Sequence, residues 1–494
     1  MALPRKSGIL LPVASLPGRH GIGSFNQEAY HFVDLLSQGG FKLWQILPLN
    51  PLGYGHSPYQ PFSSFAFDDL YIDLDELTEQ GYIEAVPPFH QDSDRILYEE
   101  VKAYKDHFLR LAYEAEMKKH PECLDAFIKE NAWVKDWAAF ILFKKRNSMV
   151  SWDNWAPEQK NWIKTRPGFA EKDVYDYEYE IWLQMTLYRQ WGKLHQYANS
   201  KGIEIIGDIP FYVGFDSCDV WANQETFLLD PQTLQPSFIA GVPPDYFSAT
   251  GQRWGNPIYN WDLLKKTDFA FLENRILGNA KIYDIIRLDH FRAFDTYWKI
   301  PSSCPTAVNG AWIEAPGYAF FDSLLAKKPE LKAKIIAEDL GDLRPQVLTL
   351  RDHYDFPGMN VIEFTFTDAE VFHKPGVDWN KENSVCYLGT HDNDMMKGFY
   401  DKLDDGSKKS WNDALNKLGF TTGTLNERFI RYALAKKAGY AIFALQDILE
   451  LDSSARINVP GVVDGINWTW RLLSLDRFSA KIDHLAELNK GYGR

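Results

Sequence analysis

The chain has 494 residues, of which 45% are hydrophobic and 24% are charged, a composition that excludes the disordered and fibrous classes of protein. Its 53 basic and 67 acidic residues give a net charge of −14, which provides no electrostatic attraction to nucleic acid and favours a neutral ligand. No apolar stretch approaches the ~20 residues needed to cross a bilayer, so we expect no membrane association.

The length is too great for one simple core, so we expect either several domains or one large barrel with insertions. Four cysteines lie far apart without a CxxC pair, which indicates neither a zinc site nor a disulfide framework and is typical of reduced thiols in the cytosol. The first residues faintly resemble a signal peptide. Pro12 interrupts their short apolar run, however, and we expect a cytoplasmic protein.

Short apolar runs that end in polar residues, glycine or proline recur eight times along the chain. Continuous β-branched runs without polar alternation are typical of strands buried on both faces, as in a parallel sheet. Segments with helical spacing lie between them, at 26–39, 179–201, 323–334 and 424–439. Eight such units predict an α/β fold, a (β/α)8 TIM barrel, with a doubly wound sheet as the alternative. The runs are GILLPVASLPG (8–18), LWQILPLNP (43–51), IEIIGDIPFYV (203–213), IIRLDHFR (285–292), IIAEDLG (335–341), MNVIEFTF (359–366), VCYLGTHDND (385–394) and YAIFALQDIL (440–449).

Two gaps between the runs are much longer than one helix. Residues 62–167 are rich in Trp, Lys and Glu at helical spacing and predict an inserted, mainly helical subdomain. Residues 211–277 predict a second insertion, which is loop-rich. It contains FIAGVPPDYFSATGQRWGNPIYNW (238–261), whose glycines, prolines and aromatic residues indicate a long ordered loop. We therefore expect one catalytic barrel over 1–494 that carries both insertions.

Ionisable residues stand at the carboxyl ends of four of the predicted strands. Because these ends gather at one rim of a barrel, where barrel enzymes keep their sites, we expect the side chains to meet at one mouth. The residues are Asp208, Arg287, Asp289, Glu338, Asp339, His391, Asp392 and Asp394.

Three of these carboxylates suit glycoside cleavage. Arg287 precedes Asp289 by two residues and points to the same side, so its guanidinium favours the ionised Asp289 that a nucleophile requires. Partial desolvation near other carboxylates should raise the pKa of Glu338 and let it hold a proton for a leaving group. A retaining pair of carboxyl groups lies about 5–5.5 Å apart. Asp392 is expected to bind sugar hydroxyls and favour the transition state, with His391 donating a hydrogen bond beside it.

Other interpretations compete with this one. Any single Asp at a strand end could be a turn former or a helix cap, and Arg287 and Asp289 could form a structural ion pair. A divalent ion is a further alternative, but the chain has no EF-hand spacing and no HExxH, and we expect no metal. Walker and GxSxG patterns are also absent.

Aromatic residues make up 15% of the chain, with 17 tryptophans, and sugar rings stack on such side chains. Although many of them belong to the core, the two segments that follow predicted strands could supply aromatic walls to the mouth. The candidates are Tyr54 and Tyr59 in GYGHSPYQPFSS, and Tyr246, Phe247, Trp254, Tyr259 and Trp261 in the loop 238–261.

These residues resemble the amylomaltases, or disproportionating enzymes, which are the 4-α-glucanotransferases of glycoside hydrolase family 77. The likeness covers nearly the whole chain. It rests on GILLPVASLPG, WQILPLNP, SPYQPFSSFA, GDIPFYV, AGVPPDYFSATGQRWGNPIYNW, IIRLDHFRAF, IIAEDLG, GTHDND and RINVPGVVDGINWTWR. One departure is Ile466 before NWTWR (467–471), where a continuous Gly–Asn–Trp run is expected. This terminal loop is expected not to touch the carboxylates.

The resemblance implies that Asp289 is the nucleophile, Glu338 the general acid/base and Asp392 the transition-state stabiliser. It further implies a (β/α)8 barrel with no separate C-terminal β-domain and no metal or organic cofactor. Loop 238–261 would be a flap over the acceptor side, and Arg287 would orient Asp289. The remaining expected substrate-binding residues are Asp208, His391, Tyr54, Tyr59, Tyr246, Phe247, Trp254 and Asn256.

The implied reaction is a double displacement on α-1,4-glucans, with a second glucan or glucose as acceptor, in starch, glycogen or maltooligosaccharide metabolism. An α-glucan hydrolase of the same barrel type would share all three carboxylates. A non-catalytic glucan-binding protein is the alternative from another class. We expect a monomer or a homodimer.

Overall fold

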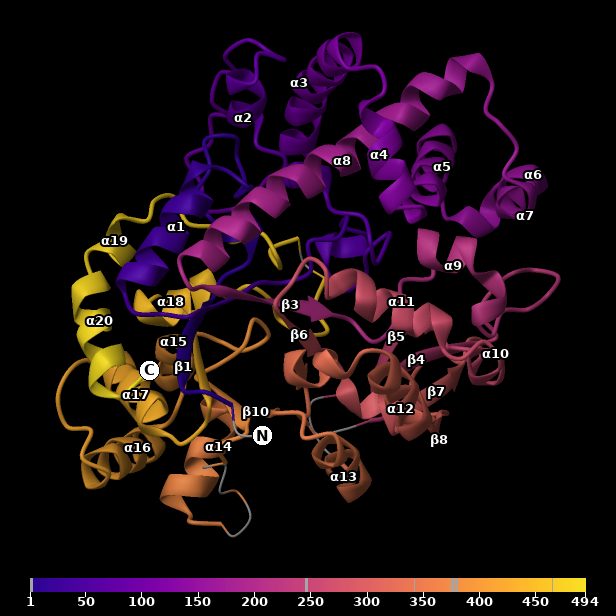
Figure 1. The fold of residues 1–494 in the computed structure, drawn as a ribbon. Helices are drawn as coiled ribbons and strands as arrows, with labels where there is room; N and C mark the ends of the chain where they lie inside the picture. The colour runs from indigo at the N-terminus through magenta and orange to yellow at the C-terminus, as the bar shows by residue number, and fades with distance from the viewer. Residues whose placement is uncertain (1–2, 245–247, 342, 375–376, 378–380, 464) are drawn as a thin grey trace.

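The computed structural model describes residues 3–244, 248–341, 343–374, 377, 381–463 and 465–494, and of Tyr54 only the backbone. Eight parallel strands form a nearly closed barrel in which strands that follow one another along the chain are neighbours in the sheet (Figure 1). This sequential order confirms the (β/α)8 barrel, and the doubly wound alternative is wrong. The strands are β1 (Lys6–Leu10), β2 (Leu43–Gln45), β3 (Glu204–Ile209), β6 (Ile285–Leu288), β9 (Ile335–Ala337), β10 (Gly358–Val361), β11 (Ser384–Tyr387) and β12 (Tyr440–Ala444).

Each of the eight predicted apolar runs contains or overlaps one of these strands. The barrel closes between β9 and β10, where the Ala337 N–H donates to the Pro357 carbonyl at 2.9 Å. Large apolar side chains fill the interior and form a cluster separate from the one that packs under the helices. The interior cluster consists of Leu10, Leu43, Ile206, Ile285, Ile336, Met359, Val361, Val385, Tyr387, Tyr440 and Ile442.

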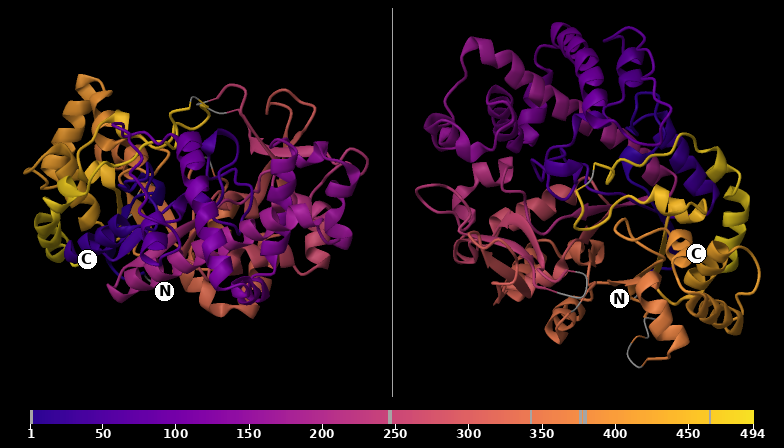
Figure 2. Two further views of the ribbon diagram at one scale, coloured as in Figure 1. Left: turned by 90° about the horizontal axis from the view of Figure 1, so that it is seen from above. Right: turned by 180° about the vertical axis from the view of Figure 1, so that it is seen from behind.

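Helices surround the strands, as Figure 2 shows from two further sides. Two predicted helices begin at side-chain caps: Asn26 accepts from the Ala29 N–H, and Thr424 accepts from the Glu427 N–H. The helix predicted at 323–334 ends early, because Pro329 starts a separate 3-10 turn at Pro329–Lys334. The helices that alternate with barrel strands include α1 (Gln27–Gln38), α8 (Glu171–Ser200), α11 (Ala270–Asn279), α12 (Gly317–Lys327), α13 (Pro345–His353), α16 (Asp405–Lys417) and α17 (Leu425–Ala435).

Between β2 and β3 the chain forms a group of helices that stands beside the barrel with α8 (Figure 1). Aromatic side chains fill this group, and Trp221 from the next insertion packs within 6.1 Å of the rings of Phe140, Phe143 and Trp155. We propose 62–167 and 211–277 as the bounds of the two inserted subdomains. The helices are α2 (Leu74–Glu79), α3 (Tyr98–Lys119), α4 (Cys123–Glu130), α5 (Trp133–Arg146), α6 (Pro157–Lys160) and α7 (Trp162–Thr165).

The second insertion corrects the prediction of a long loop at 238–261. Strands β4 (Phe238–Val242) and β5 (Gln252–Pro257) pair antiparallel in that segment, and β7 (Thr296–Pro301) and β8 (Ala311–Glu314) complete a four-stranded sheet. A side chain at Gly241 would meet the Gln252 carbonyl at 2.0 Å, so the composition that indicated a loop is what lets the strands approach. Helices α9 (Cys218–Ala222) and α10 (Trp261–Lys266) flank the β4–β5 segment in the sequence.

After β12 the described residues form helices and irregular chain without a strand. Within the described part of the chain, no helix has both the length and the hydrophobicity to span a membrane. The remaining helices are α14 (Ile362–Phe366), α15 (Met396–Asp401), α18 (Leu445–Ile448), α19 (Asp476–Ser479) and α20 (Ile482–Gly491).

Candidate active site

The carboxyl ends of β3, β6, β9 and β11 bring the predicted ionisable residues to one mouth of the barrel. Register places Asp208 on β3 directly beside Arg287 on β6. Asp289 follows β6, and its backbone N–H donates to the Ile209 carbonyl at 3.0 Å. Glu338 follows β9. Sequence positions far apart therefore meet because parallel strands all end at the same rim.

Arg287 is the central cation of this mouth, and its side chain is 4% exposed. Its Nη1 donates to Asp208 Oδ1 and Oδ2 at 2.8 and 2.7 Å, and to Asp289 Oδ1 at 2.9 Å. The buried guanidinium thus binds two carboxylates from neighbouring strands, and its charge opposes a rise in the pKa of Asp208. For Asp208 burial outweighs this attraction, and its pKa is raised.

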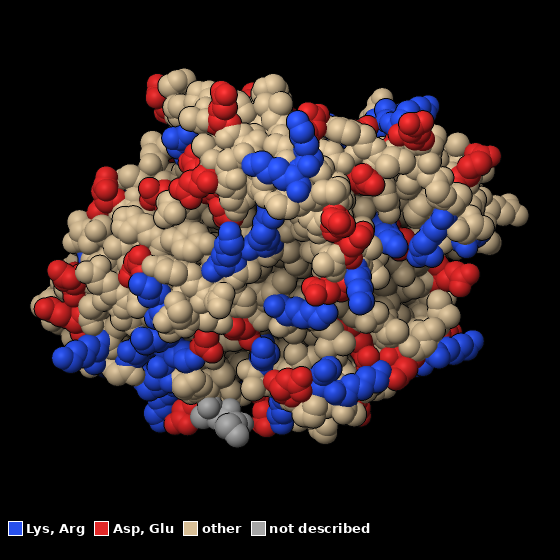
Figure 3. Space-filling view, turned by 45° about the horizontal axis from the view of Figure 1, so that its top comes forward, with Lys and Arg blue, Asp and Glu red and all other residues tan. Residues whose placement is uncertain are grey.

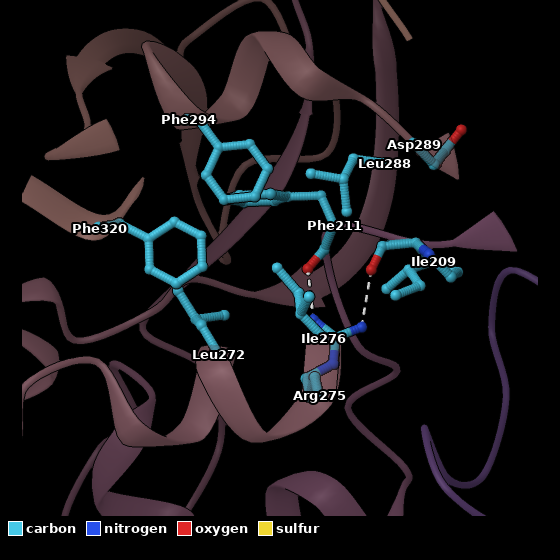
Figure 4. Close-up of a pocket in the computed structure, with 10 residues that line it drawn as sticks. Ile209, Phe211, Leu272, Arg275, Ile276, Leu288, Asp289, Phe294 and Phe320 are labelled. Carbon is cyan, nitrogen blue, oxygen red and sulfur yellow. Dashed lines mark hydrogen bonds between the residues drawn. The ribbon is translucent and has the colours of Figure 1, made fainter. Parts of the chain in front are cut away.

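Asp289 stands at the edge of the mouth with its side chain 27% exposed. Figure 4 shows its carboxylate pointing away from an apolar pocket lined by Phe211, Phe294 and Phe320. In that pocket Arg275 donates to the Pro210 and Phe211 carbonyls at 2.7 and 2.9 Å, which fixes the chain that leaves β3. Asp289 is therefore held by Arg287 on one side and remains accessible on the other.

Glu338 lies in a different environment. Both of its carboxyl oxygens accept backbone N–H groups, Oε1 from Leu340 at 2.9 Å and Oε2 from His290 at 2.8 Å. Burial raises the pKa of Glu338 to about 7, and the charge of Asp289 adds to this effect while Arg287 opposes it. Glu338 can therefore hold a proton near neutral pH, while Asp289 is paired with a cation.

Asp392 is 45% exposed and is held from one side. Its Oδ1 accepts from Asn458 Nδ2 at 2.7 Å and lies 3.4 Å from His391 Nε2, and Arg456 donates to its backbone carbonyl at 2.5 Å. The His391 ring is buried, and its Nδ1 has no hydrogen-bond partner among the described residues. A buried polar atom without a partner at an open mouth suits a ligand hydroxyl.

Tyr59 connects the two sides of the mouth. Its hydroxyl donates to Asp208 Oδ2 at 2.7 Å, and its ring stacks on His391 with a centroid distance of 5.1 Å. Trp468 lies 5.8 Å from the Tyr59 ring and 6.0 Å from the His391 ring. The terminal loop 467–471 thus adds Trp468 to the aromatic wall, while Asn458, which precedes this loop, binds Asp392.

The hairpin that ends in β5 forms another wall. The Trp254 ring meets the His290 ring edge to face at 4.9 Å. Asn256, predicted to bind substrate, donates to the Val213 carbonyl at 2.8 Å and accepts from Gln60 Nε2 at 3.0 Å, so these contacts hold β5 in place.

The other aromatic candidates differ in position. Tyr259 is 1% exposed, and its hydroxyl donates to the Phe211 carbonyl at 2.7 Å, which places it in the core. Trp261 is half-buried against the same core. Tyr246, Phe247 and the side chain of Tyr54 lie outside the described residues.

Two of the strand-end carboxylates are engaged in contacts with other residues. Asp339 pairs with Arg351 and accepts the Met359 N–H at 2.7 Å. Asp394 accepts from Ser453 Oγ at 2.8 Å and pairs with Lys402. Their contacts are structural, as the interpretation of single strand-end residues as caps had allowed.

Four residues at the mouth were missed by the sequence analysis. Tyr212 and His290 stand next to predicted strand ends, so their position was a usable signal. Asn458 and Trp468 stand on the irregular chain after β12, where no strand end marked them. Only the folded structure shows that this chain returns to the mouth.

One group of three possible metal ligands occurs among the described residues, namely His20, Asp73 and Asp75. His20 Nδ1 contacts the Tyr104 hydroxyl at 2.8 Å, and Asp75 also pairs with Arg19 at 3.1 Å. The carboxylates of the mouth do not form such a group. On the face in Figure 3, acidic and basic side chains are interspersed and separated by uncharged surface, which suits a neutral ligand.

Comparisons with known proteins identify the family to which the chain is similar. The model of glycoside hydrolase family 77, described as 4-alpha-glucanotransferase, matches residues 11–476. The 4-alpha-glucanotransferase of Aquifex aeolicus is 40% identical over 499 residues, which cover 99% of each chain. That of Synechocystis sp. is 39% identical over 506 residues, covering 99% of this chain and 98% of its own. The solved amylomaltase from Streptococcus agalactiae in complex with acarbose has a TM-score of 0.93 at 37% identity, with 99% of both chains covered.

The raised pKa of Glu338 makes a prediction about stability. Because this pKa of about 7 lies above the ordinary 4.5, Glu338 contributes stability that is fully present below the ordinary value and is lost as pH rises through the folded one. The free energy of unfolding of the wild type should therefore fall relative to Glu338→Gln by up to about 3 kcal/mol between about pH 4 and about pH 8. Urea unfolding at constant ionic strength measures this difference.

Glu314→Gln is the matched control, because the Glu314 side chain is 80% exposed. The free energy of unfolding of this variant should depend on pH in the same way as that of the wild type. A difference between wild type and Glu338→Gln that stays constant over this range would contradict the raised pKa.

Proposed function

The chain belongs to glycoside hydrolase family 77, the 4-alpha-glucanotransferases. From this premise we propose which residue performs each step of the reaction. Asp289 is the nucleophile, Glu338 the general acid/base and Asp392 the stabiliser of the transition state. The observation that carries the proposal is the contrast between two neighbouring carboxyl groups: Asp289 is paired with a buried guanidinium, whereas burial raises the pKa of Glu338 to about 7.

In the first half of the reaction, Asp289 attacks the anomeric carbon of the donor glucan. Glu338 gives its proton to the glycosidic oxygen, that bond breaks, and the shortened glucan leaves. The product is a glycosyl ester on Asp289. Arg287 orients the attacking carboxylate, since its Nη1 binds Asp289 Oδ1 and leaves the exposed part of the carboxylate free.

The other groups of the mouth recognise the reacting sugar. Asp392 faces the developing positive charge of the oxocarbenium-like transition state, with its orientation fixed by Asn458. Asp208 and His391 hold sugar hydroxyls, and the free Nδ1 of His391 supplies one polar contact. Tyr59 and Trp468 offer aromatic surface to the sugar ring.

In the second half, Glu338 has lost its proton and acts as a base. It removes the proton from the 4-hydroxyl of an acceptor glucan or glucose, whose oxygen attacks the anomeric carbon and displaces Asp289. Two inversions give net retention and a new α-1,4 bond. Transfer exceeds hydrolysis when the acceptor displaces water from the intermediate, and the hairpin that carries Trp254 is placed to help it do so.

The partners that we propose are α-1,4-glucans, including maltooligosaccharides and amylose, together with glucose. The related amylomaltase was solved with acarbose, which supports an oligosaccharide site. We also propose a cytoplasmic location, which the four free cysteines support, and a monomer or a homodimer. A 4-alpha-glucanotransferase of Solanum tuberosum described as chloroplastic/amyloplastic is 36% identical over 510 residues, so a plastid is the alternative location for this chain.

The division of roles predicts different responses of two variants to a donor that needs no acid. Glu338→Gln should lower turnover of maltotriose by about 10²–10⁴-fold, but it should slow release of fluoride from α-maltotriosyl fluoride much less, because fluoride leaves without a proton. Asp289→Asn should abolish turnover of both donors, since neither can form the ester. Stopped-flow fluoride release measures the first step directly.

Glu314→Gln serves again as the control and should match the wild type with both donors. If Glu338→Gln lowered the rate with both donors by the same factor, Glu338 would not be the general acid. Fluoride release by Asp289→Asn at the wild-type rate would remove Asp289 from the role of nucleophile.

The products formed from maltotriose distinguish the transferase from the hydrolase alternative. Transfer should give glucose together with longer oligomers and no net gain of reducing ends. Anion-exchange chromatography combined with a reducing-end assay follows both quantities. A gain of reducing ends without longer products would show that water is the normal acceptor.

A further inference from the structure

His290 has an unusual backbone conformation at the centre of the mouth. Its φ is +51°, in the left-handed region that residues with a Cβ rarely adopt. This conformation directs its N–H to Glu338 Oε2 at 2.8 Å. A hydrogen bond to a carboxylate favours the ionised form, so this N–H moderates the pKa of Glu338 while it fixes the position of the carboxyl group.

The side chain of the same residue faces β5, which pairs with β4 in what we call the flap hairpin, Phe238–Val242 and Gln252–Pro257. Its ring meets Trp254 of β5 edge to face at 4.9 Å and lies 6.2 Å from the Tyr212 ring. The Nε2 atom is buried and has no hydrogen-bond partner among the described residues. Burial also lowers the pKa of His290 to about 4, so the ring is neutral at pH 7 and acts as a packing surface.

Trp254 is itself tied to the donor side of the mouth. Gln60 stands next to Tyr59, and its Nε2 donates to the Trp254 carbonyl at 3.2 Å and to Asn256 Oδ1 at 3.0 Å. The position of β5 is therefore set by its pairing with β4, by contacts to Gln60 and Val213, and by the contact of the Trp254 ring with His290. Among these residues, His290 is the one that also binds Glu338.

We propose that His290 is a positioning residue that couples the flap hairpin to Glu338. This proposal rests on the proposed functions of Glu338 as the acid/base and of the hairpin in favouring the acceptor over water. Its ring contacts the Trp254 ring, and its backbone N–H binds the carboxyl group of Glu338, which must deprotonate the acceptor. An acceptor that packs against Trp254 therefore reacts with a base whose position is fixed by His290, the residue that also contacts Trp254. A water molecule makes no such contact with Trp254. His290 in this way favours transfer over hydrolysis.

Two substitutions separate the ring of His290 from its backbone. Asparagine tolerates the left-handed conformation but is too short to reach Trp254, so His290→Asn should keep the N–H contact and lose the ring contact. Alanine resists this conformation, so His290→Ala should disturb the N–H contact as well. Each variant is assayed with maltotriose for the ratio of transfer to hydrolysis and for the pH dependence of kcat/KM.

We expect His290→Asn to lower the ratio of transfer to hydrolysis about three- to tenfold with an unchanged basic limb of the pH profile. Trp254→Leu should give a similar loss, and the double variant should lose no more than the worse single variant, because both remove one contact. In His290→Ala the basic limb should move to higher pH, since loss of an N–H donor raises the pKa of Glu338.

His353→Asn is the matched control, because the exposed His353 ring also meets aromatic rings edge to face but stands on α13. It should keep the wild-type ratio, and circular dichroism should show that every variant is folded. A wild-type ratio in His290→Asn together with a reduced ratio in Trp254→Leu would overturn the coupling alone. A wild-type ratio in Trp254→Leu would overturn both the coupling and the acceptor role of the hairpin.

Discussion

The buried guanidinium of Arg287 is the constraint on which the mouth of the barrel depends. A cation with 4% of its side chain exposed needs compensating carboxylates, and it finds Asp208 on the neighbouring strand and Asp289 two residues further along its own strand. Removing one partner of such a buried pair typically costs ~3–5 kcal/mol, because the remaining charge stays uncompensated. The same contacts therefore connect β3 with β6 and fix the direction of the Asp289 carboxylate, so that stability and the proposed chemistry share one interaction.

The three proposed catalytic carboxyl groups differ mainly in what surrounds them. Asp289 is paired with a cation, whereas Glu338 accepts backbone N–H groups from His290 and Leu340 and keeps its proton to about pH 7. Asp392 is the most open of the three at 45% exposure and is held by the amide of Asn458. Similar side chains can thus serve as nucleophile, acid and electrostatic stabiliser, because the fold gives each a different balance of burial and partners.

The eight strands were predictable because continuous apolar runs that end in polar residues are typical of a parallel barrel, and the same rule found Asp208, Arg287, Asp289, Glu338 and Asp392. Two features were not accessible in this way. The sheet of β4, β5, β7 and β8 lacks a hydrophobic alternation, since glycines such as Gly241 are needed where its chains approach closely. Asn458 and Trp468 belong to irregular chain that reaches the mouth only through long-range packing, and no local pattern encodes such a contact.

The central claim is that Asp289 forms a covalent bond to the donor sugar, while Glu338 protonates the leaving oxygen and then deprotonates the acceptor. The most direct measurement is peptide mass mapping of Glu338→Gln after incubation with α-maltotriosyl fluoride. This donor forms the ester without an acid, and the variant lacks the base that would activate an acceptor to cleave the ester. We expect the peptide containing Asp289 to gain the mass of a maltotriosyl group, with fragmentation placing this group on the Asp289 side chain. A maltotriosyl group on any other residue, or fluoride release without a labelled peptide, would contradict it.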